Sequence, residues 1–275
     1  MLRDITLGQY YPAESGIHAM DPRTKLFGTL IYIIALFLFN NVLGFLVVTG
    51  FLVLAIRSSH VPFSYMVKGL KAIVVLLLIA AVFNMFLTSG TPLVTIGPLT
   101  ISDVGLRNAG LMAIRMIYLI VGTSIMTLTT TPNQLTDGLE RSLHFLNKIH
   151  VPVHEIAMMM SIALRFIPIL IEETDKIMKA QMARGADFET GGIVKRAKAM
   201  VPLLVPLFVS AFRRASDLAL AMEARCYHGG EGRTKMKPLQ YHAVDRVGYL
   251  VIFLFLILVI ATRFVYEPLV SLIGV

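Results

Sequence analysis

The sequence reads "IEETDKIMKAQMARG" at residues 171–185 and "RRASDLALAMEARC" at residues 213–226, and these two segments decide the organisation of the chain around them. Each has the composition of a helix that ends in a short cationic tip. The tips are Ala183-Arg184-Gly185 and Ala224-Arg225-Cys226. An arginine in the last turn complements the helix dipole, and a following glycine supplies a left-handed cap. Because the tip recurs on two successive long helices, we expect a partner with two matched sockets.

The rest of the chain has the composition of a membrane anchor. Of the 275 residues, 56% are hydrophobic, and the mean hydropathy is +0.74. Both values lie outside the range of soluble proteins, so we predict an all-α integral membrane protein. The net charge is +8, but the basic residues lie between apolar runs and not in one continuous run. This distribution is typical of cytoplasmic loops and argues against binding to nucleic acid.

Five apolar runs predict about five transmembrane helices, since roughly 20 residues cross the hydrocarbon core. The runs cover residues 26–39, 42–56, 72–87, 105–128 and 249–262, with an alternative start for the last near residue 243. The first two are separated by Asn40-Asn41 and predict a tight hairpin. Residues 88–103, "TSGTPLVTIGPLTISD", contain no Lys or Arg. This pattern predicts two short strands around a Gly-Pro turn in an extracellular loop.

The orientation follows from the charge of the loops, because Lys and Arg accumulate on the cytoplasmic side. With the N-terminus inside, the outer segments contain no basic residue except Arg263 in the final tail. The inner segments before residue 131 contain Arg3, Arg23, Lys25, Arg57, Lys68 and Lys71. We therefore predict a multi-pass protein of the cell membrane with a cytoplasmic N-terminus.

The central region is the one topological ambiguity. Residues 153–171 pass a hydropathy window and residues 201–212 nearly do, but the second run is too short to span the membrane. If both crossed, their connection would place six basic residues outside, against the charge bias. These residues are Lys176, Lys179, Arg184, Lys195, Arg196 and Lys198. We therefore predict two long cytoplasmic or interfacial helices, preceded by a shorter amphipathic helix at residues 133–148.

This interpretation divides the chain into three parts. Residues 1–131 contain the N-terminal segment and transmembrane helices 1–4, and residues 132–240 contain three cytoplasmic coupling helices, two of them long. Residues 241–275 contain the final transmembrane helix and a tail.

Four motifs resemble one known family. They are "GQYYPAESGIHAMDPRTKL" at residues 8–26, "LRFIPIL" at 164–170, "MARG" at 182–185 and "DLALAMEARC" at 217–226. Together they resemble the transmembrane T component (EcfT/CbiQ family) of energy-coupling factor (ECF) transporters, over nearly the whole chain. The resemblance is most specific in the paired Ala-Arg motifs. It implies a complex with two ABC-type ATPases and a membrane-embedded, substrate-binding S component, which takes up vitamins or other micronutrients.

The resemblance also implies roles for the two tips. Arg184 and Arg225 would dock in grooves on the two ATPases. The residues that would shape these contacts are Ala183, Gly185, Ala224 and Cys226. The second tip has cysteine where the first has glycine, so the flexibility of Gly185 is not duplicated there.

The sequence contains no nucleotide-binding motif of its own. It has neither a Walker glycine-rich loop with a lysine nor a glycine-rich dinucleotide turn. We therefore predict a non-catalytic subunit without a cofactor, whose partners hydrolyse ATP. His150 and His154 have the i, i+4 spacing of some metal ligands, but Pro152 lies between them and no Cys or carboxylate cluster completes a site. No metal site is predicted.

A contact with the S component is predicted on the first long helix, at Met158, Met159, Met160, Arg165 and Pro168. Methionine side chains are flexible, and they either fill a core or form a groove that adapts to several partners. The second possibility suits a T component that serves several interchangeable S components.

Three alternatives remain open from the sequence. One is a T component dedicated to a cobalt or nickel importer. The second is a membrane enzyme at the cytoplasmic interface that uses Glu172, Glu173, Asp175 and Arg165. The third is a self-sufficient channel or carrier, for which only Asn84, Arg107 and Arg115 offer polar groups within the spans. Arg115 is an intramembrane charge, which is either functional or paired with a polar group of the bundle.

Overall fold

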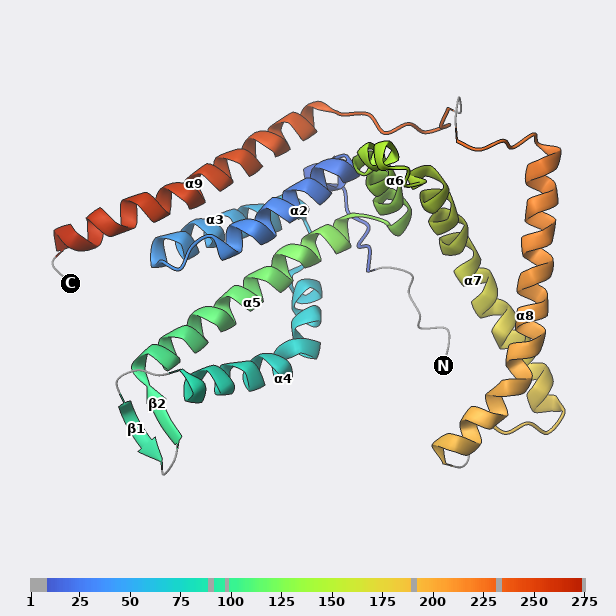
Figure 1. Ribbon diagram of the computed structural model, residues 1–275, viewed down its shortest axis with the longest axis horizontal. Coiled ribbons are helices and arrows are strands. Elements are labelled where there is room, and N and C mark those ends of the chain that lie inside the picture. Colours follow the sequence, from blue (N-terminus) through green and yellow to red (C-terminus); the bar gives the residue numbers. More distant parts are fainter. Residues whose placement is uncertain (1–8, 89–91, 97–98, 189–191, 231–233, 274–275) are drawn as a thin grey trace. The chain divides into compact units, whose positions relative to one another are not determined.

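The computed structural model describes residues 9–88, 92–96, 99–188, 192–230 and 234–273 (Figure 1). The chain forms two compact units. We call the first the bundle unit; its described residues are 9–138 and 239–273. We call the second the long-helix unit; it comprises residues 139–238. Each unit is described by itself below.

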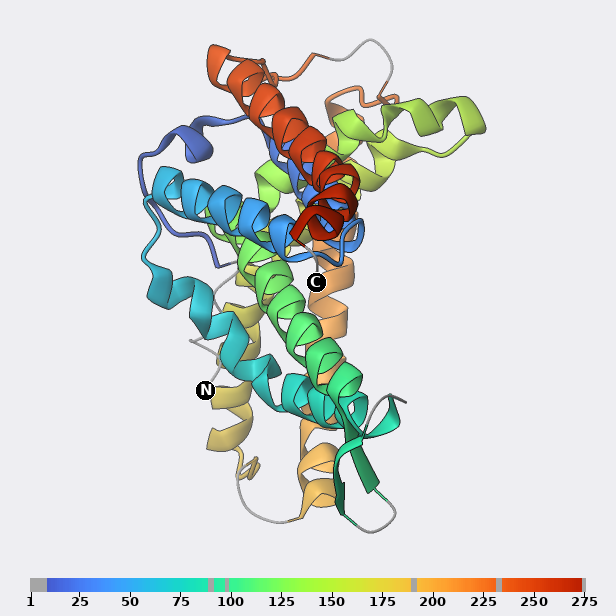
Figure 2. The same cartoon turned by 90° about the vertical axis from the view of Figure 1, so that its left-hand side faces the viewer.

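The bundle unit consists mainly of helices that pack on one apolar core. Its helices are α1 (Gly16–Ala19), α2 (Pro22–Phe37), α3 (Val42–Ser59), α4 (Phe63–Leu87), α5 (Asp103–Thr129) and α9 (Ala243–Ile273). Helices α2 and α3 both contact α5 and α9, and α4 packs along α5 (Figure 2). Tyr32, Leu36, Phe45, Val121 and Phe255 are among the buried side chains of this core. The alternation of long apolar runs with polar turns in the sequence produces this arrangement.

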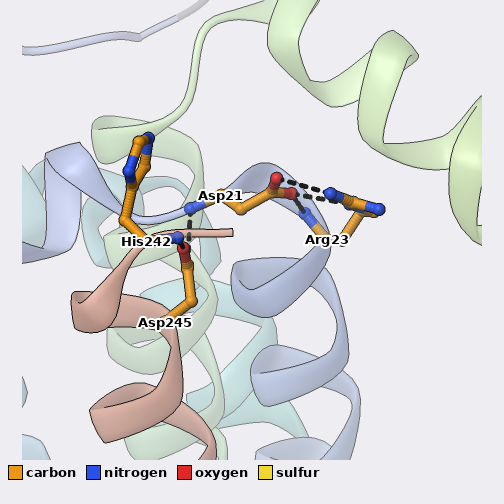
Figure 3. Close-up of polar contacts among 4 residues, drawn as sticks. All are labelled: Asp21, Arg23, His242 and Asp245. Carbon is orange, nitrogen blue, oxygen red and sulfur yellow. Dashed lines mark hydrogen bonds and ion pairs between the residues drawn. The ribbon is translucent and has the colours of Figure 1, made fainter. Parts of the chain in front are cut away.

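A buried polar cluster joins the beginning of α2 to the beginning of α9 (Figure 3). The Asp245 carboxylate is fully buried and accepts hydrogen bonds from the backbone N–H of Asp21 and of His242, both at 2.7 Å. The Arg23 guanidinium donates to the Asp21 carboxylate at 3.0 and 2.9 Å. Burial raises the pKa of Asp21, but the hydrogen bonds from Arg23 outweigh it, so the pKa lies below its usual value. Asp21 also caps α2, which begins at Pro22.

A short antiparallel hairpin connects α4 to α5 in the bundle unit (Figure 2). Its strands are β1 (Pro92–Ile96) and β2 (Leu99–Ser102), with Ile96 opposite Leu99 and Thr95 opposite Thr100. The prediction of two short strands here is confirmed, and the predicted Gly-Pro turn lies outside the described residues. Apart from this hairpin, the regular structure of the described chain is helical, so the all-α membrane class is confirmed.

Five of the described helices are long and apolar enough to cross a membrane, which agrees with the predicted number. Their apolar segments are Val42–Ser59, Asp103–Thr129, Val153–Ala183, Lys198–Ala224 and Ala243–Phe264. The set differs from the prediction. It includes Val153–Ala183 and Lys198–Ala224, which belong to the two helices predicted to be cytoplasmic or interfacial. It lacks α2, which has only 16 residues, and α4, whose apolar segment is Ile73–Phe86. Helix α9 continues to Ile273, beyond the end of its apolar segment at Phe264, so the predicted tail after residue 262 is helical as far as Ile273.

The long-helix unit is built around two long helices joined by a short connection. Helix α7 is Val153–Ala183 and helix α8 is Ile193–Ala224. The sequence suggested that the apolar run at 201–212 was too short to span a membrane, but this is wrong for the helix, which has 32 residues. Figure 1 shows α8 bending in its first half, the half that contains Pro202 and Pro206. Proline removes a helical hydrogen bond and bends a long helix without ending it.

The amphipathic helix predicted before this pair is shorter than expected. Helix α6 (Pro132–Ser142) ends six residues before the predicted end at residue 148, and a 3₁₀ helix, His144–Ile149, follows it. The C-cap residue of the 3₁₀ helix, His150, adopts a left-handed conformation with φ of 61°. The chain then enters α7 after Pro152.

Candidate functional site

The first cationic tip ends α7 in a defined turn. Arg184 is the C-cap residue, and Gly185 follows it with φ of 90°. The Gly185 N–H donates to the carbonyl of Met182 at 2.9 Å, and the next N–H, of Ala186, donates to the carbonyl of Gln181 at 3.0 Å. These two bonds with a left-handed residue between them form a Schellman motif. The glycine therefore acts as the left-handed cap that the sequence suggested.

The second tip ends α8 in the same turn. Arg225 is the C-cap residue, and Cys226 follows it with φ of 54°. The Cys226 N–H donates to the carbonyl of Glu223 at 2.8 Å, and the Tyr227 N–H donates to the carbonyl of Met222 at 3.1 Å. The bonds join the same relative positions as in the first tip. Although cysteine replaces glycine, the backbone of the second tip therefore repeats that of the first.

The side chains of both tips are free to meet a partner. Arg184 and Arg225 are exposed, and neither has an ion pair or hydrogen bond through its guanidinium within the described chain. The remaining tip residues, Ala183, Gly185, Ala224 and Cys226, are also exposed. A guanidinium is always charged and presents its donors in a rigid fork that fits carboxylates and carbonyl groups. Each tip can therefore insert a forked donor between small neighbouring residues.

We expect exchange of Cys226 for glycine to stabilise the last turn of α8. A left-handed conformation costs a residue with a Cβ about 1 kcal/mol more than glycine, so Cys226→Gly should slow amide exchange there about fivefold. Gly185→Ala should speed exchange at the end of α7 by a similar factor. The measurement is hydrogen exchange of the amides at the end of each helix, in the purified protein.

Gly192→Ala is the matched control, since Gly192 has φ of −70° and open space around its Cα. Gly192→Ala should leave amide exchange at the C-terminal ends of α7 and α8 unchanged. If Gly185→Ala were as harmless as Gly192→Ala, the left-handed cap would not determine the geometry of the first tip.

A polar clamp holds α7 against α8 between the two tips. The Glu173 carboxylate of α7 accepts a hydrogen bond from the Ser210 hydroxyl of α8. Its other oxygen accepts from Nε and Nη2 of Arg214, at 3.1 and 2.9 Å. Ser210 and Arg214 are four residues apart and therefore lie on one face of α8. This clamp could not be predicted from the sequence, because its partners lie 37 and 41 residues from Glu173.

The clamp lies at equal sequence distance from the two tips. Arg184 follows Glu173 by eleven residues, and Arg225 follows Arg214 by eleven residues. At 1.5 Å per residue, each arm is roughly 16 Å long. Figure 1 shows α7 and α8 running in opposite directions, so the tips extend away from the clamp toward opposite ends of the pair. The long-helix unit thus presents two matched tips on two arms of equal length.

The residues predicted for a contact with the S component differ in exposure. Met159 and Met160 are 58% and 50% exposed, whereas Met158 is partly buried and lines a cavity beside His154. Arg165 and Pro168 are exposed further along α7. Met158 is therefore less accessible to a partner than the other four residues.

A larger apolar surface lies on α8, within the apolar run at residues 201–212. We call it the α8 stripe; each of its side chains is more than half exposed. It consists of Val201, Leu204, Val205, Phe208, Val209 and Phe212. The spacing of three and four residues places these side chains along one side of the helix. That spacing is visible in the sequence and would have identified the stripe.

The histidine considered as a metal ligand has a structural role. His154 Nδ1 lies 2.9 Å from one oxygen of Glu140, and Lys235 Nζ lies 2.5 Å from the other. Burial raises the pKa of Glu140, but the hydrogen bonds from Lys235 and His154 lower it by more. The pKa of Glu140 therefore lies below its usual value. Within the described residues, no three His, Cys, Asp or Glu side chains gather as metal ligands would. This cluster joins the segment after the second tip to α6 and α7.

The acids considered for an enzyme do not form a separate catalytic group. Glu173 is held by the clamp, while Glu172 beside it is exposed. Asp175, two residues after Glu173, is partly buried, and Arg165 lies more than two turns before Glu173 on α7.

Comparison with known proteins places these features in a family context. The family model for the cobalt transport protein CbiQ matches residues 13–236. The energy-coupling factor transporter transmembrane protein EcfT of Clostridium kluyveri is 54% identical over 252 residues, which cover 91% of this chain and 93% of the relative. EcfT of Thermosediminibacter oceani is 49% identical over 265 residues, or 96% of this chain and 100% of the relative. EcfT of Bacillus subtilis is 48% identical over 246 residues, or 89% and 93%.

Proposed function

This chain belongs to the family of the cobalt transport protein CbiQ and the ECF transporter transmembrane protein EcfT, and from this premise we propose that it couples two ABC-type ATPases to a substrate-binding S component. The observation that carries the proposal is the pair of matched, exposed arginine tips on arms of equal length. In this proposal the chain is a non-catalytic subunit of the cell membrane. ATP is hydrolysed by its partners.

Each tip docks in a groove on one ATPase. The Schellman turn fixes the direction in which Arg184 or Arg225 leaves its helix, and the forked guanidinium pairs with carboxylate or carbonyl groups in the groove. Two tips of the same backbone geometry suit two sockets related by a two-fold or pseudo-two-fold axis. The ATPase pair then holds the long-helix unit at both ends.

The clamp converts motion at the tips into motion of the helix pair. When ATP binding closes the ATPases, the sockets move and carry Arg184 and Arg225 with them. Because α7 and α8 are joined at Glu173, the arms turn about this point instead of separating freely. The free energy for the change comes from the difference in ATPase contacts between the two states.

The S component rests on the apolar surfaces of the long helices. The α8 stripe exposes six large side chains on one side of the helix, a surface typical of a protein or membrane interaction site. Met159, Met160, Arg165 and Pro168 of α7 extend the proposed contact. In this arrangement residues 132–240 form a cytoplasmic coupling region, and the N-terminus is also cytoplasmic, in keeping with the bias of basic residues.

The cargo belongs to the S component in this account, so it is a vitamin or another micronutrient that the S component selects. The relatives described above are named as transmembrane proteins of ECF transporters, which supports a shared T component. The description of the family model, cobalt transport protein, keeps a dedicated metal-ion importer as the second candidate.

Reconstitution tests the proposed function. The chain is co-expressed with the two ATPases and an S component from the same genome, and the complex is placed in vesicles. We expect ATP-driven uptake of the ligand of that S component, and no uptake when the chain is left out. Uptake that persists without the chain would contradict the proposal.

A further inference from the structure

The bundle unit contains a polar cleft that the coupling function does not use. The cleft has a volume of about 560 Å³ and lies between the α2–α3 turn, α4 and α5. Arg107 and Arg115 of α5 both line it, with Asn40, Asn84 and Asn108 as further polar groups. The arginines are eight residues apart, so they lie on the same side of α5, about 12 Å apart along its axis.

Arg115 is held in a fixed position in the wall of the cleft. Its Nη2 donates to the carbonyl of Phe39 and to the side-chain oxygen of Asn40, both at 2.7 Å. The guanidinium carbon lies 5.7 Å from the ring centre of Phe37 and 6.0 Å from those of Phe39 and Phe45. Such aromatic walls attract a cation. The side chain is thus positioned by the α2–α3 turn before any ligand arrives.

The charge of Arg115 is not balanced by the protein. Its Nε is buried without a hydrogen-bond partner, and no carboxylate pairs with Arg115 or with Arg107 in the part of the chain that the structure describes. Asp103 is the acidic residue among those that line the cleft. Two arginines and one aspartate give the cleft a net charge of +1. An unbalanced cation at the edge of a membrane is costly, so the cleft favours a ligand with one negative charge.

We propose that this cleft binds the phosphodiester head group of an anionic phospholipid. In this proposal the α2–α3 turn lies at the surface of the membrane, where the backbone groups at the helix ends find polar surroundings. Arg115 is bound to that turn and therefore lies at the level of lipid head groups. The cleft is also lined by Leu111, Met112 and Met116, which contact the glycerol and upper acyl chains. A free phosphate would leave this apolar part of the cleft empty.

Lipid binding to the delipidated full chain in neutral detergent tests the proposal. Phosphatidylglycerol, diacylglycerol and inorganic phosphate are each titrated, and bound lipid is counted by native mass spectrometry while the melting temperature is recorded. We expect saturable binding of phosphatidylglycerol with a rise in melting temperature. Diacylglycerol and inorganic phosphate should have little effect. Arg107→Gln should weaken the binding of phosphatidylglycerol about tenfold, as expected for the loss of a charged hydrogen bond.

Arg263→Gln is the matched control, because Arg263 is an exposed cation beside Thr262, which bonds to Asn41 of the same turn, yet it does not line the cleft. Arg115→Lys keeps the charge and removes the fork, and it should also weaken binding. If Arg115→Lys does not fold, the binding of phosphatidylglycerol by Arg107→Gln alone tests the proposal. The Arg107 side chain is exposed, so its replacement should not prevent folding. Equal binding by Arg107→Gln and Arg263→Gln would overturn the proposal. If inorganic phosphate raised the melting temperature as much as phosphatidylglycerol does, the proposal that the anion belongs to a lipid would be wrong.

Discussion

Reversal of charge at the tips is expected to abolish transport while the chain remains in the membrane. Arg184→Glu and Arg225→Glu each place a carboxylate where a groove is shaped for a guanidinium. Loss of a buried charged pair at an interface costs about 2–5 kcal/mol, which corresponds to a weakening of roughly 30-fold or more. Because transport requires both ATPases to move with the long helices, either change alone should reduce uptake to near background.

Binding and uptake should respond differently to the single and double changes. With one tip intact, the ATPase pair is still held by one contact and should co-purify in reduced amount. With both tips changed, the advantage of two linked contacts is lost and co-purification should disappear. Uptake should already be near background in each single variant. The measurements are the amount of ATPase retained on the tagged chain and the rate of ATP-driven uptake in vesicles.

The same helices offer matched controls. Lys179 is exposed on α7 five residues before the first tip, and Arg213 is exposed on α8 twelve residues before the second. Lys179→Glu and Arg213→Glu make the same change in charge outside the tips and should retain most of the uptake. If they were as harmful as the tip variants, the general positive charge of the unit would explain the effect.

Removal of the clamp is expected to separate ATP hydrolysis from transport. Glu173→Ala leaves both tips intact, so the ATPases should stay bound and hydrolyse ATP. The helices lose the hydrogen bonds from Ser210 and Arg214 that join them at equal distance from the tips. Hydrogen bonds to charged groups contribute about 1.5–3 kcal/mol each, and partial exposure of this pair reduces that value. We expect the uptake per ATP hydrolysed to fall about tenfold.

Glu172→Ala is the control for this prediction, because Glu172 is the exposed neighbour of Glu173. A charge exchange, Glu173→Arg with Arg214→Glu, should restore part of the coupling, since it rebuilds an ion pair at the same place. If Glu173→Ala transports as efficiently as the wild type, the helices do not need the clamp to act together.

The tips themselves could be found from the sequence because their signal is local. Arginine followed by glycine after a long amphipathic segment predicts a capped helix end without any knowledge of the fold. The equivalence of the second tip could not be predicted in the same way. Cys226 has to adopt a conformation that usually favours glycine, and only its φ of 54° and the two capping hydrogen bonds show that it does.

The C-terminal end of α8 could not be predicted from the hydropathy of the sequence. The apolar run ends at Phe212, and the charges of Arg213 and Arg214 ended the hydropathy signal there. The helix nevertheless continues through an alanine-rich segment to Ala224, because alanine, leucine and methionine all favour the helix. The fall in hydropathy after Phe212 therefore shows that α8 changes from an apolar to a polar segment there, and it does not show that the helix ends.

The clamp and the Arg115 cleft depend on contacts between distant parts of the sequence. From the sequence, Glu173 was only one of several residues considered for an enzyme, and its contacts with Ser210 and Arg214 depend on the fold. Arg115 was recognised as an unusual charge, but its anchoring by Phe39 and Asn40 required the packing of the α2–α3 turn against α5. Patterns of period 3.6 identify the side of a helix and do not identify its partner.

Site-specific crosslinking shows whether the two tips contact the ATPases. A photoreactive amino acid replaces Arg184 or Arg225 in the assembled transporter, and Lys179 or Arg213 in the control samples. We expect the ATPases to be captured from positions 184 and 225 with much higher yield than from positions 179 and 213. If a heterodimer is present, each tip should capture a different ATPase subunit. Capture of the ATPases from the control positions but from neither tip would contradict the proposal.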